Sequence, residues 1–298
     1  MIGRAPVGAL PALEVVLLGT GGPMPDPGRA GPSTLIRGGD KIFLVDAGRG
    51  VLMRLAAVGV GADRLTATLL THLHSDHLTD LNDVITTRWV TTFVPSPLVV
   101  VGPPRTQHLV DGILASLGPD VEYRLTHHAD LTWKPPVDIR EIADGVVLDA
   151  DGVRVIAAPT DHRPVAPTIG YRIEHGGYSV VLAGDTVRCI GLDRLCAGAD
   201  VLVHTVVRKE LLISTGIARL RDACDYHSSV EQAADTAQRA NVATLVLTHC
   251  VPAFAPGDEE AWRELATSRF DGDVILAVDL DRVAVGEAVL PIGQELQA

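Results

Sequence analysis

Short apolar runs recur along the chain and alternate with stretches whose apolar residues repeat at helical spacing. The runs carry Val, Leu and Ile on successive positions, which is typical of strands covered on both faces by helices. The predicted strands are Leu13–Leu18, Lys41–Asp46, Ala67–Thr71, Leu98–Val101, Val153–Ala157, Ser179–Ala183, Val201–His204 and Thr244–Thr248. The predicted helices are Gly50–Val58, Asp80–Val90, Gln107–Leu117, Val230–Ala240 and Asp258–Ser268. This alternation predicts an α/β fold.

The segment Val137–Arg154 has a different pattern, because strand-like pieces there alternate with two Asp-Gly pairs. The pairs Asp144-Gly145 and Asp151-Gly152 predict antiparallel hairpins. No Pro-rich or Gly/Ser-rich linker long enough to separate independent domains interrupts the chain. We therefore expect one α/β domain over residues 1–298, with two strand-rich halves.

Composition and charge narrow the range of partners. The chain is 47% hydrophobic but only 4% aromatic, so its core must consist mainly of aliphatic side chains. The formal net charge is −12, and an acidic surface disfavours a protein that grips many phosphates of RNA or DNA. The charge leaves room for a local basic patch or for a small anionic substrate.

Cysteine usage and hydropathy point to a cellular compartment. The four cysteines show neither zinc-ribbon spacing nor a disulfide framework, so reduced thiols are expected. No apolar run is long enough to cross a bilayer, and the N-terminus lacks the pattern of a secretory signal. We expect a cytoplasmic protein with no membrane partner.

Three histidines and an aspartate follow the predicted strand Ala67–Thr71 within six residues. They are His72, His74, Asp76 and His77. Imidazole and carboxylate ligands suit zinc or a similar divalent ion, and a loop that leaves a buried strand can point several of them inward. The alternative is a polar loop exposed to solvent. The density of imidazoles favours the metal site.

The spacing H-x-H-x-D-H after a strand resembles the signature of the metallo-β-lactamase superfamily. Other segments fit that family in order: Leu18-Gly19-Thr20-Gly21-Gly22, Val45-Asp46-Ala47-Gly48, Ala183-Gly184-Asp185-Thr186 and Thr248-His249. The first of them resembles the opening of the ribonuclease Z and arylsulfatase-like branch. The resemblance covers about Leu13 to Pro252. It implies a four-layer αββα sandwich, in which two mixed β-sheets are flanked by helices.

The resemblance also implies a ligand set for two zinc ions, although Mn²⁺ or Fe would fit similar ligands. One ion would take His72, His74 and His162, the last chosen because it follows a predicted strand and precedes Gly170-Tyr171-Arg172. The other ion would take Asp76, His77 and His249, with Asp185 shared between the two. Asp76 would also orient the attacking water. Asp46 and Thr71 would support the ligands, Asp46 by fixing the tautomer of an imidazole.

His227-Ser228-Ser229 precedes a predicted helix and resembles the His-Ser-Thr motif of the ribonuclease Z branch. In that branch the histidine donates a proton to the leaving group, so His227 is a candidate catalytic acid. A serine in this place is also an ordinary helix cap. Both interpretations can hold together. Histidines outside the motifs are expected to lie on the surface or to support ligands; they are His108, His127, His128, His175 and His204.

Two departures from the ribonuclease Z pattern bear on the substrate. Thr205 stands where that branch usually carries a glutamate that supports the acid histidine. The segment between His162 and Asp185 holds one hairpin, Thr168–Glu174 and Tyr178–Ala183, and leaves no room for the tRNA-gripping arm of the short bacterial enzymes. These departures favour a small substrate over tRNA.

The sequence therefore predicts a two-zinc hydrolase that uses a metal-bridging hydroxide on a small anionic phosphodiester, such as a cyclic nucleotide. The alternative is an arylsulfatase-like or lactone hydrolase on the same metals. A tRNA 3′-processing endonuclease and a non-catalytic sensor are ranked lower. No extended nucleic-acid grip is expected. The resemblance adds a homodimer to these expectations.

Overall fold

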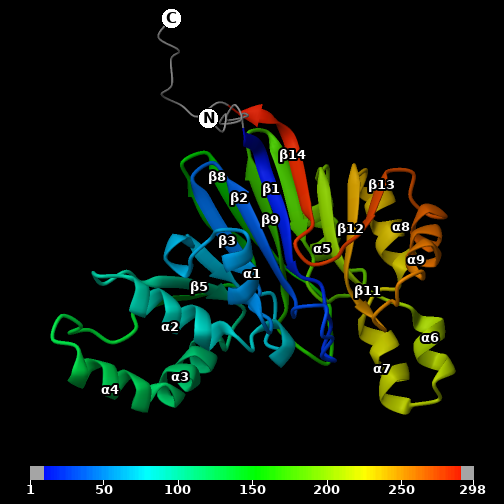
Figure 1. The fold of residues 1–298 in the computed structure, drawn as a ribbon. Coiled ribbons are helices and arrows are strands. Elements are labelled where there is room, and N and C mark those ends of the chain that lie inside the picture. The colour runs from blue at the N-terminus through cyan, green and yellow to red at the C-terminus, as the bar shows by residue number, and fades with distance from the viewer. Residues whose placement is uncertain (1–9, 290–298) are drawn as a thin grey trace, which may run out of the picture.

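Two seven-stranded β-sheets form the centre of the molecule in the computed structural model, which describes residues 10–289 (Figure 1). The first sheet has the order β14 (Arg282–Val289), β1 (Leu10–Gly19), β2 (Ser33–Gly38), β3 (Lys41–Val45), β4 (Ala67–Leu69), β5 (Leu98–Gly102), β6 (Val137–Glu141). The second has the order β13 (Asp273–Leu276), β12 (Thr244–Val251), β11 (Val201–Val207), β10 (Tyr178–Leu182), β9 (Ile169–His175), β8 (Val153–Pro159), β7 (Gly145–Ala150). Residues 1–9 and 290–298 of the expected single domain lie outside the described residues.

Both sheets are mixed. Strands β3 to β6 are parallel to one another, while β14, β1, β2 and β3 pair antiparallel. The second sheet repeats this plan, because β10 to β13 are parallel and β7 to β10 are antiparallel. The carboxyl ends of parallel strands meet at one edge of a sheet, so each sheet offers such an edge for a site.

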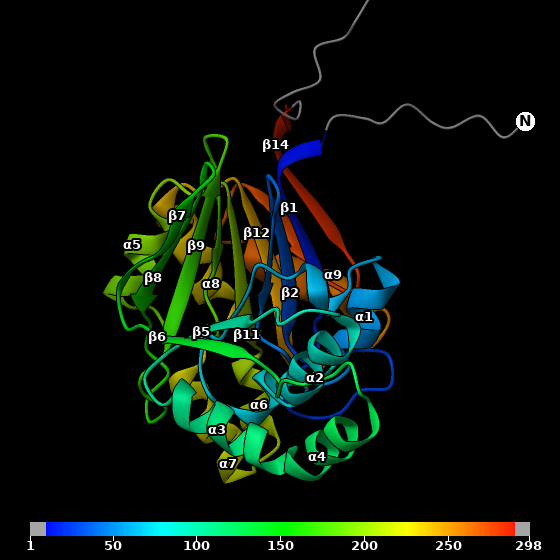
Figure 2. The same cartoon turned by 90° about the vertical axis from the view of Figure 1, so that its left-hand side faces the viewer.

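Helices cover the outer faces of both sheets. Helices α1 (Val51–Ala57), α2 (Leu81–Thr91) and α3 (Thr106–Ser116) bury apolar residues against the first sheet. Helices α5 (Ile190–Cys196), α8 (Val230–Ala240) and α9 (Glu259–Thr267) do the same against the second. In Figure 1, α1, α2 and α3 lie to the left of the sheets and α8 and α9 lie to the right, and Figure 2 shows the first group facing the viewer. Helices α4 (Gly118–His127), α6 (Lys209–Ser214) and α7 (Ala218–Tyr226) extend beyond the strands (Figure 1). The expected αββα sandwich is confirmed.

The apolar runs of strands such as β1 and β11 are continuous because these strands are buried on both faces. In β1, Leu13 and Leu17 face the core between the sheets, whereas Val16 and Leu18 face the helices. In β11, Val203 faces the inner core and Leu202 faces the helices. Alternating residues therefore enter different cores, and no polar period appears in the sequence.

Every predicted strand and helix is present, with ends shifted by a few residues. The sequence pattern does not predict strands β2, β13 and β14 or helices α4 to α7, and it indicates β6 and β7 only as strand-like pieces of Val137–Arg154. One predicted hairpin is wrong. Strand β6 pairs with β5 in the first sheet, while β7 pairs with β8 in the second, so the chain crosses between sheets at Asp144-Gly145. The turn at Asp151-Gly152 does join an antiparallel pair, β7 and β8.

No helix among residues 10–289 is long and apolar enough to span a membrane.

His204 lies fully buried in β11, although the sequence placed it among surface or ligand-supporting histidines. Its Nδ1 donates to the Thr205 carbonyl oxygen at 2.7 Å, and its Nε2 has no partner among the described residues. Burial lowers the pKa of His204 to about 4. The imidazole is therefore neutral in the folded protein at neutral pH.

Replacing His204 with Leu should reduce the loss of stability in acid. Since the pKa of His204 is lower in the folded state than in the unfolded chain, the unfolded state binds the proton first, and stability falls as pH falls between about 6.5 and 4. Between pH 7 and pH 5 the unmodified protein should lose about 2 kcal/mol more than His204→Leu. Urea unfolding of both metal-stripped proteins at the two pH values measures this. Replacing the exposed His108 should leave the loss unchanged.

Candidate active site

The predicted site residues gather at one edge of the sandwich, at the ends of strands from both sheets. His72, His74, Asp76 and His77 follow β4 in the first sheet. His162, Asp185 and His249 follow or end β8, β10 and β12 in the second. All are buried except His74, which is half-buried. The fold thus brings together every residue that the resemblance named as a ligand.

These side chains form two clusters of potential metal ligands. The first contains His72, His74, His162 and Asp185. In it, His74 Nδ1 lies 3.1 Å from His72 Nε2 and 3.3 Å from His162 Nε2. Ligand atoms of a tetrahedral ion with bonds of about 2.1 Å are separated by about 3.4 Å. Both distances are close to the spacing that one divalent ion requires, and all ligand atoms of the cluster lie within 4.8 Å of one another.

The second cluster contains Asp76, His77 and His249. Asp76 Oδ2 lies 3.3 Å from His249 Nε2 and 3.8 Å from His77 Nε2. Asp185 Oδ2 lies 3.5 Å from His77 Nε2 and 3.8 Å from His72 Nε2, which belong to different clusters. One carboxylate oxygen therefore faces both groups.

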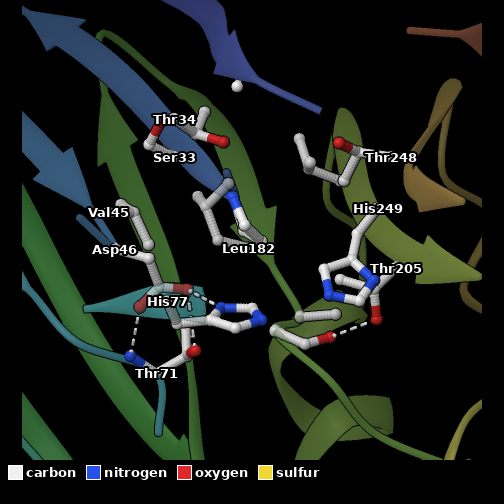
Figure 3. A pocket seen from close by; sticks show the side chains of 15 residues that line it. Ser33, Thr34, Val45, Asp46, Thr71, His77, Leu182, Thr205, Thr248 and His249 are labelled. Atoms are coloured by element: carbon white, nitrogen blue, oxygen red, sulfur yellow. Dashed lines mark hydrogen bonds and ion pairs between the residues drawn. The ribbon is translucent and has the colours of Figure 1, made fainter. Parts of the chain in front are cut away.

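Asp46 supports residues of both clusters, and Figure 3 shows its contacts with Thr71 and His77. Its carboxylate accepts from Thr71 N at 2.8 Å, from Thr71 Oγ1 at 2.9 Å and from His77 Nδ1 at 2.8 Å. Because the Thr71 hydroxyl donates to Asp46, it accepts from Nδ1 of His72, 3.0 Å away. Both imidazoles thus hold a proton on Nδ1 and turn Nε2 toward the site, as metal-binding histidines do.

His162 is oriented in the same way by a residue that the sequence did not single out. Its Nδ1 donates to the backbone carbonyl of Tyr226 at 2.9 Å, and the two rings meet edge to face with centroids 5.1 Å apart. Tyr226 also contacts the ring of His227, with centroids 4.9 Å apart. Tyr226 directly precedes the candidate acid His227, and this position was the signal that the sequence offered. The contact uses a backbone carbonyl, which every residue has, so the residue type does not reveal it.

His227 lies at the edge of the site, with Nδ1 3.8 Å from Asp185 Oδ2. Burial lowers the pKa of His227 to about 4. Ser229 caps α8, forming a capping box with Gln232, and the Ser228 hydroxyl donates to the Thr186 carbonyl at 2.9 Å. The cap therefore coexists with a histidine held beside the clusters. The Thr205 hydroxyl donates to the Gly184 carbonyl at 3.0 Å, so it does not orient His227.

The buried charges of the site leave several polar atoms without partners among the described residues. These are His77 Nε2, Asp185 Oδ1, His227 Nδ1 and His249 Nδ1. Burial would lower the pKa of His77, but the carboxylates of Asp185 and Asp46 outweigh it and raise that pKa well above its usual range. Burial would raise the pKa of Asp185, but His249 and His77 hold it well below its usual range. Orphaned nitrogens around ionised carboxylates fit a pair of divalent cations.

Two residues of the site have strained backbones. Asp46 and His249 both have positive φ angles, 58° and 49°, which non-glycine residues rarely adopt. Gly184 has a φ of 64°, and a Cβ atom there would lie 2.8 Å from Cβ of Thr71. The packing around the site holds these conformations, as is common where function requires a fixed geometry.

Comparison with known proteins identifies relatives along most of the chain. A family model described as the beta-lactamase superfamily domain matches residues 41–250. Ribonuclease Z of Mycobacterium avium is 62% identical over 275 residues, which are 92% of this chain and 98% of that protein. Ribonuclease Z of Mycolicibacterium gilvum is 58% identical over 279 residues, with 93% and 98% covered.

Solved structures with the same fold are more distant in sequence. The metallo-β-lactamase fold protein YhfI of Bacillus subtilis has a TM-score of 0.71 at 23% identity, covering 91% of this chain and 98% of that one. The short form of human tRNase Z has a TM-score of 0.69 at 23% identity, covering 92% and 100%. At this identity the two structures show the fold alone.

The expectation of a small anionic ester substrate without a nucleic-acid grip is wrong, because relatives that align over nearly their whole length are named for a ribonuclease. The sulfate-ester, lactone and sensor alternatives lose their support with it. The observation behind the expectation holds, since β9 and β10 form a short hairpin at Gly176-Gly177 with no inserted arm. The inference failed because an arm is only one way of contacting RNA. A charge summed over the chain does not describe the surface beside the site.

Proposed function

This chain belongs to the ribonuclease Z family of the beta-lactamase superfamily, and on that premise we propose that it is a metal-dependent endoribonuclease that processes the 3′ end of precursor tRNA. The observation that carries the proposal is the 62% identity to a ribonuclease Z along 92% of the chain. The two clusters of buried ligands at one edge of the sandwich support the metal-dependent hydrolysis of a phosphodiester bond.

Zinc is the ion that this donor set suits best. The two clusters contain five imidazoles and two carboxylates, which is a nitrogen-rich set of ligands. Their ligand atoms lie at short distances, close to those around a tetrahedral ion. We propose that His72, His74 and His162 hold one ion, that Asp76, His77 and His249 hold the other, and that Asp185 joins both. When bound, two such ions supply a water nucleophile that is active near neutral pH and positive charge for the phosphate oxygens.

Asp76 and His227 would perform the proton chemistry. One oxygen of Asp76 faces His249, so the other remains to orient the attacking water. The pKa of His227 is about 4 when no substrate is bound, so its imidazole is neutral at neutral pH. The negative charge of a bound phosphodiester raises that pKa, because it stabilises the imidazolium. With its pKa raised, His227 takes up a proton from solvent and would donate it to the leaving oxygen of the RNA, which leaves the imidazole neutral again.

The substrate is tested with an end-labelled precursor tRNA that carries a 3′ trailer. The metal-stripped protein reloaded with zinc or manganese should cut it once, near the end of the acceptor stem, and an unfolded RNA of equal length should be cut far more slowly. A chelator should abolish the cut and added metal should restore it. An intact precursor, under conditions in which bis(p-nitrophenyl) phosphate is hydrolysed, would contradict the proposal.

Replacing His227 with Ala should slow cleavage of the precursor by about 10²-fold or more, since a positioned general acid contributes that much. The loss should be much smaller with bis(p-nitrophenyl) phosphate, because nitrophenolate leaves without a proton. Ser229→Ala is the matched control: it removes the helix cap at a cost of about 1 kcal/mol in stability and should leave kcat unchanged. Equal losses on the two substrates would exclude the acid role.

RNA must be held without an inserted arm, and α7 offers cations beside the site. Arg219 and Arg221 are exposed on α7 and form no ion pair among the described residues. The helix ends at Tyr226, whose carbonyl binds His162. Figure 1 shows α6 and α7 extending beyond the ends of the strands. These features support α7 as a contact for RNA phosphates.

Changing Arg219 and Arg221 to Ala should weaken binding of the precursor and leave hydrolysis of bis(p-nitrophenyl) phosphate intact. If both side chains contact phosphates, the slope of log Kd against log salt should fall by about 2. Fluorescence anisotropy over a range of salt concentrations measures this slope. Arg269→Ala is the control, since Arg269 precedes β13 at the opposite edge of the second sheet. An unchanged slope would exclude this helix as the contact.

A further inference from the structure

We infer that Asp279 is a positioning residue for the second ligand cluster, formed by Asp76, His77 and His249. Asp279 lies in the turn between β13 and β14 and belongs to none of the sequence motifs. It contacts no ligand side chain directly and acts through the glycine-rich loop that follows β1. The inference rests on the two-metal part of the proposed function and is independent of the RNA substrate.

Asp279 binds that loop at both of its ends. Its Oδ1 accepts from Thr20 N at 2.9 Å and from Thr20 Oγ1 at 2.8 Å. Its Oδ2 accepts from Ala30 N at 2.7 Å and pairs with the Arg54 guanidinium at 2.9 Å. The side chain is only 7% exposed. A buried carboxylate with four donors holds its partners by charge-assisted hydrogen bonds, which are stronger than neutral ones.

The first end of the loop holds the backbone of His249. The Thr20 carbonyl accepts from His249 N at 3.1 Å, and a Cβ atom on Gly22 would lie 3.6 Å from the His249 ring. His72, His77 and His162 each have a hydrogen-bond partner on Nδ1, whereas His249 Nδ1 has none among residues 10–289. Besides the contact of Nε2 with Asp76, the orientation of the His249 ring therefore depends on its strained backbone and on the loop packed against it.

The other end of the loop supports the backbone of Asp76 and His77. Gly31, next to Ala30, donates to the Arg49 carbonyl at 2.7 Å. Gly31 also packs on Gly48, where a Cβ atom would lie 2.5 Å from the Gly31 carbonyl carbon and 2.6 Å from the Asp76 carbonyl oxygen. Ala47, which directly precedes Gly48, donates to the His77 carbonyl at 2.7 Å. Both oxygens of Asp279 thus lead to the same cluster, and neither leads to the cluster of His72, His74 and His162.

Replacing Asp279 with Asn keeps the shape of the side chain but puts a hydrogen-bond donor where one carboxylate oxygen accepted. One oxygen of Asn can still accept from Thr20, but the amide nitrogen then faces the Ala30 amide and the Arg54 guanidinium, which are also donors. Two donors that face each other in a buried place cannot both be satisfied, so one end of the loop must move. Supporting contacts of this kind change metal affinity by about 10-fold to 100-fold.

The test compares Asp279→Asn with Asp281→Asn in the full chain. Asp281 lies in the same turn, but among the described residues its side chain accepts a hydrogen bond from Val278 N and none from the loop. Metal-stripped proteins are titrated with Co²⁺, followed by visible absorbance, and with Zn²⁺ in competition with a chromophoric chelator. We expect Asp279→Asn to lose at least tenfold in affinity for one of the two equivalents and to keep the other within twofold. Asp281→Asn should retain both.

Unchanged affinities in Asp279→Asn, or equal losses for both equivalents, would overturn the inference. If Asp279→Asn does not fold, Thr20→Val and Thr20→Ser decide instead, since only Ser keeps the hydroxyl that donates to Asp279. The inference then requires Thr20→Val to weaken one equivalent and Thr20→Ser to match the unmodified protein. A protein that binds two metals normally but leaves precursor tRNA intact would overturn the proposed substrate and leave the role of Asp279 standing.

Discussion

A single buried carboxylate oxygen organises the site. Oδ2 of Asp185 lies between 3.5 and 3.9 Å from a ring nitrogen of each of five histidines: His72, His77, His162, His227 and His249. So many imidazoles in one buried place are unfavourable unless they share positive charge with carboxylates or bind cations. The rest of the site can be understood as the structure that keeps these groups together.

The sandwich supplies that structure through strand ends. Two sheets, each with a run of parallel strands, bring their carboxyl ends to a common edge, and the ligands follow those strands directly. Asp46 and Thr71 fix two imidazoles by side-chain hydrogen bonds, and Tyr226 fixes a third by its carbonyl. Nδ1 of His249 has no such partner among the described residues, so the position of this ligand depends in part on the loop that Asp279 holds. Similar ligands are thus held by different means.

The wrong expectation about the substrate came from a feature that the chain lacks, the inserted arm, and from its overall charge. The short hairpin of β9 and β10 and the net charge of −12 are both real, and together they favoured a small molecule. Neither describes how charge is distributed on the surface; α7, which ends beside the site at Tyr226, exposes Arg219 and Arg221 as well as Asp222 and Asp225. Relatives of nearly the same length are named for a ribonuclease. Recognition of a large substrate depends on the local arrangement of charge, which chain composition averages away.

The sequence by itself determined the features that are encoded locally. Apolar runs identified most of the buried strands, and the cluster His72 to His77 identified the metal loop, because strand, loop and ligands are neighbours in the chain. The resemblance then supplied His162, Asp185, His227 and His249 in order. Only the tertiary structure decided which strands share a sheet, as at Asp144-Gly145, and which distant groups support the ligands. The carbonyl of Tyr226 and the carboxylate of Asp279 leave no local pattern, because their contacts join residues far apart in sequence. Such contacts are fixed by how the two sheets pack, and no spacing of residue types records that packing.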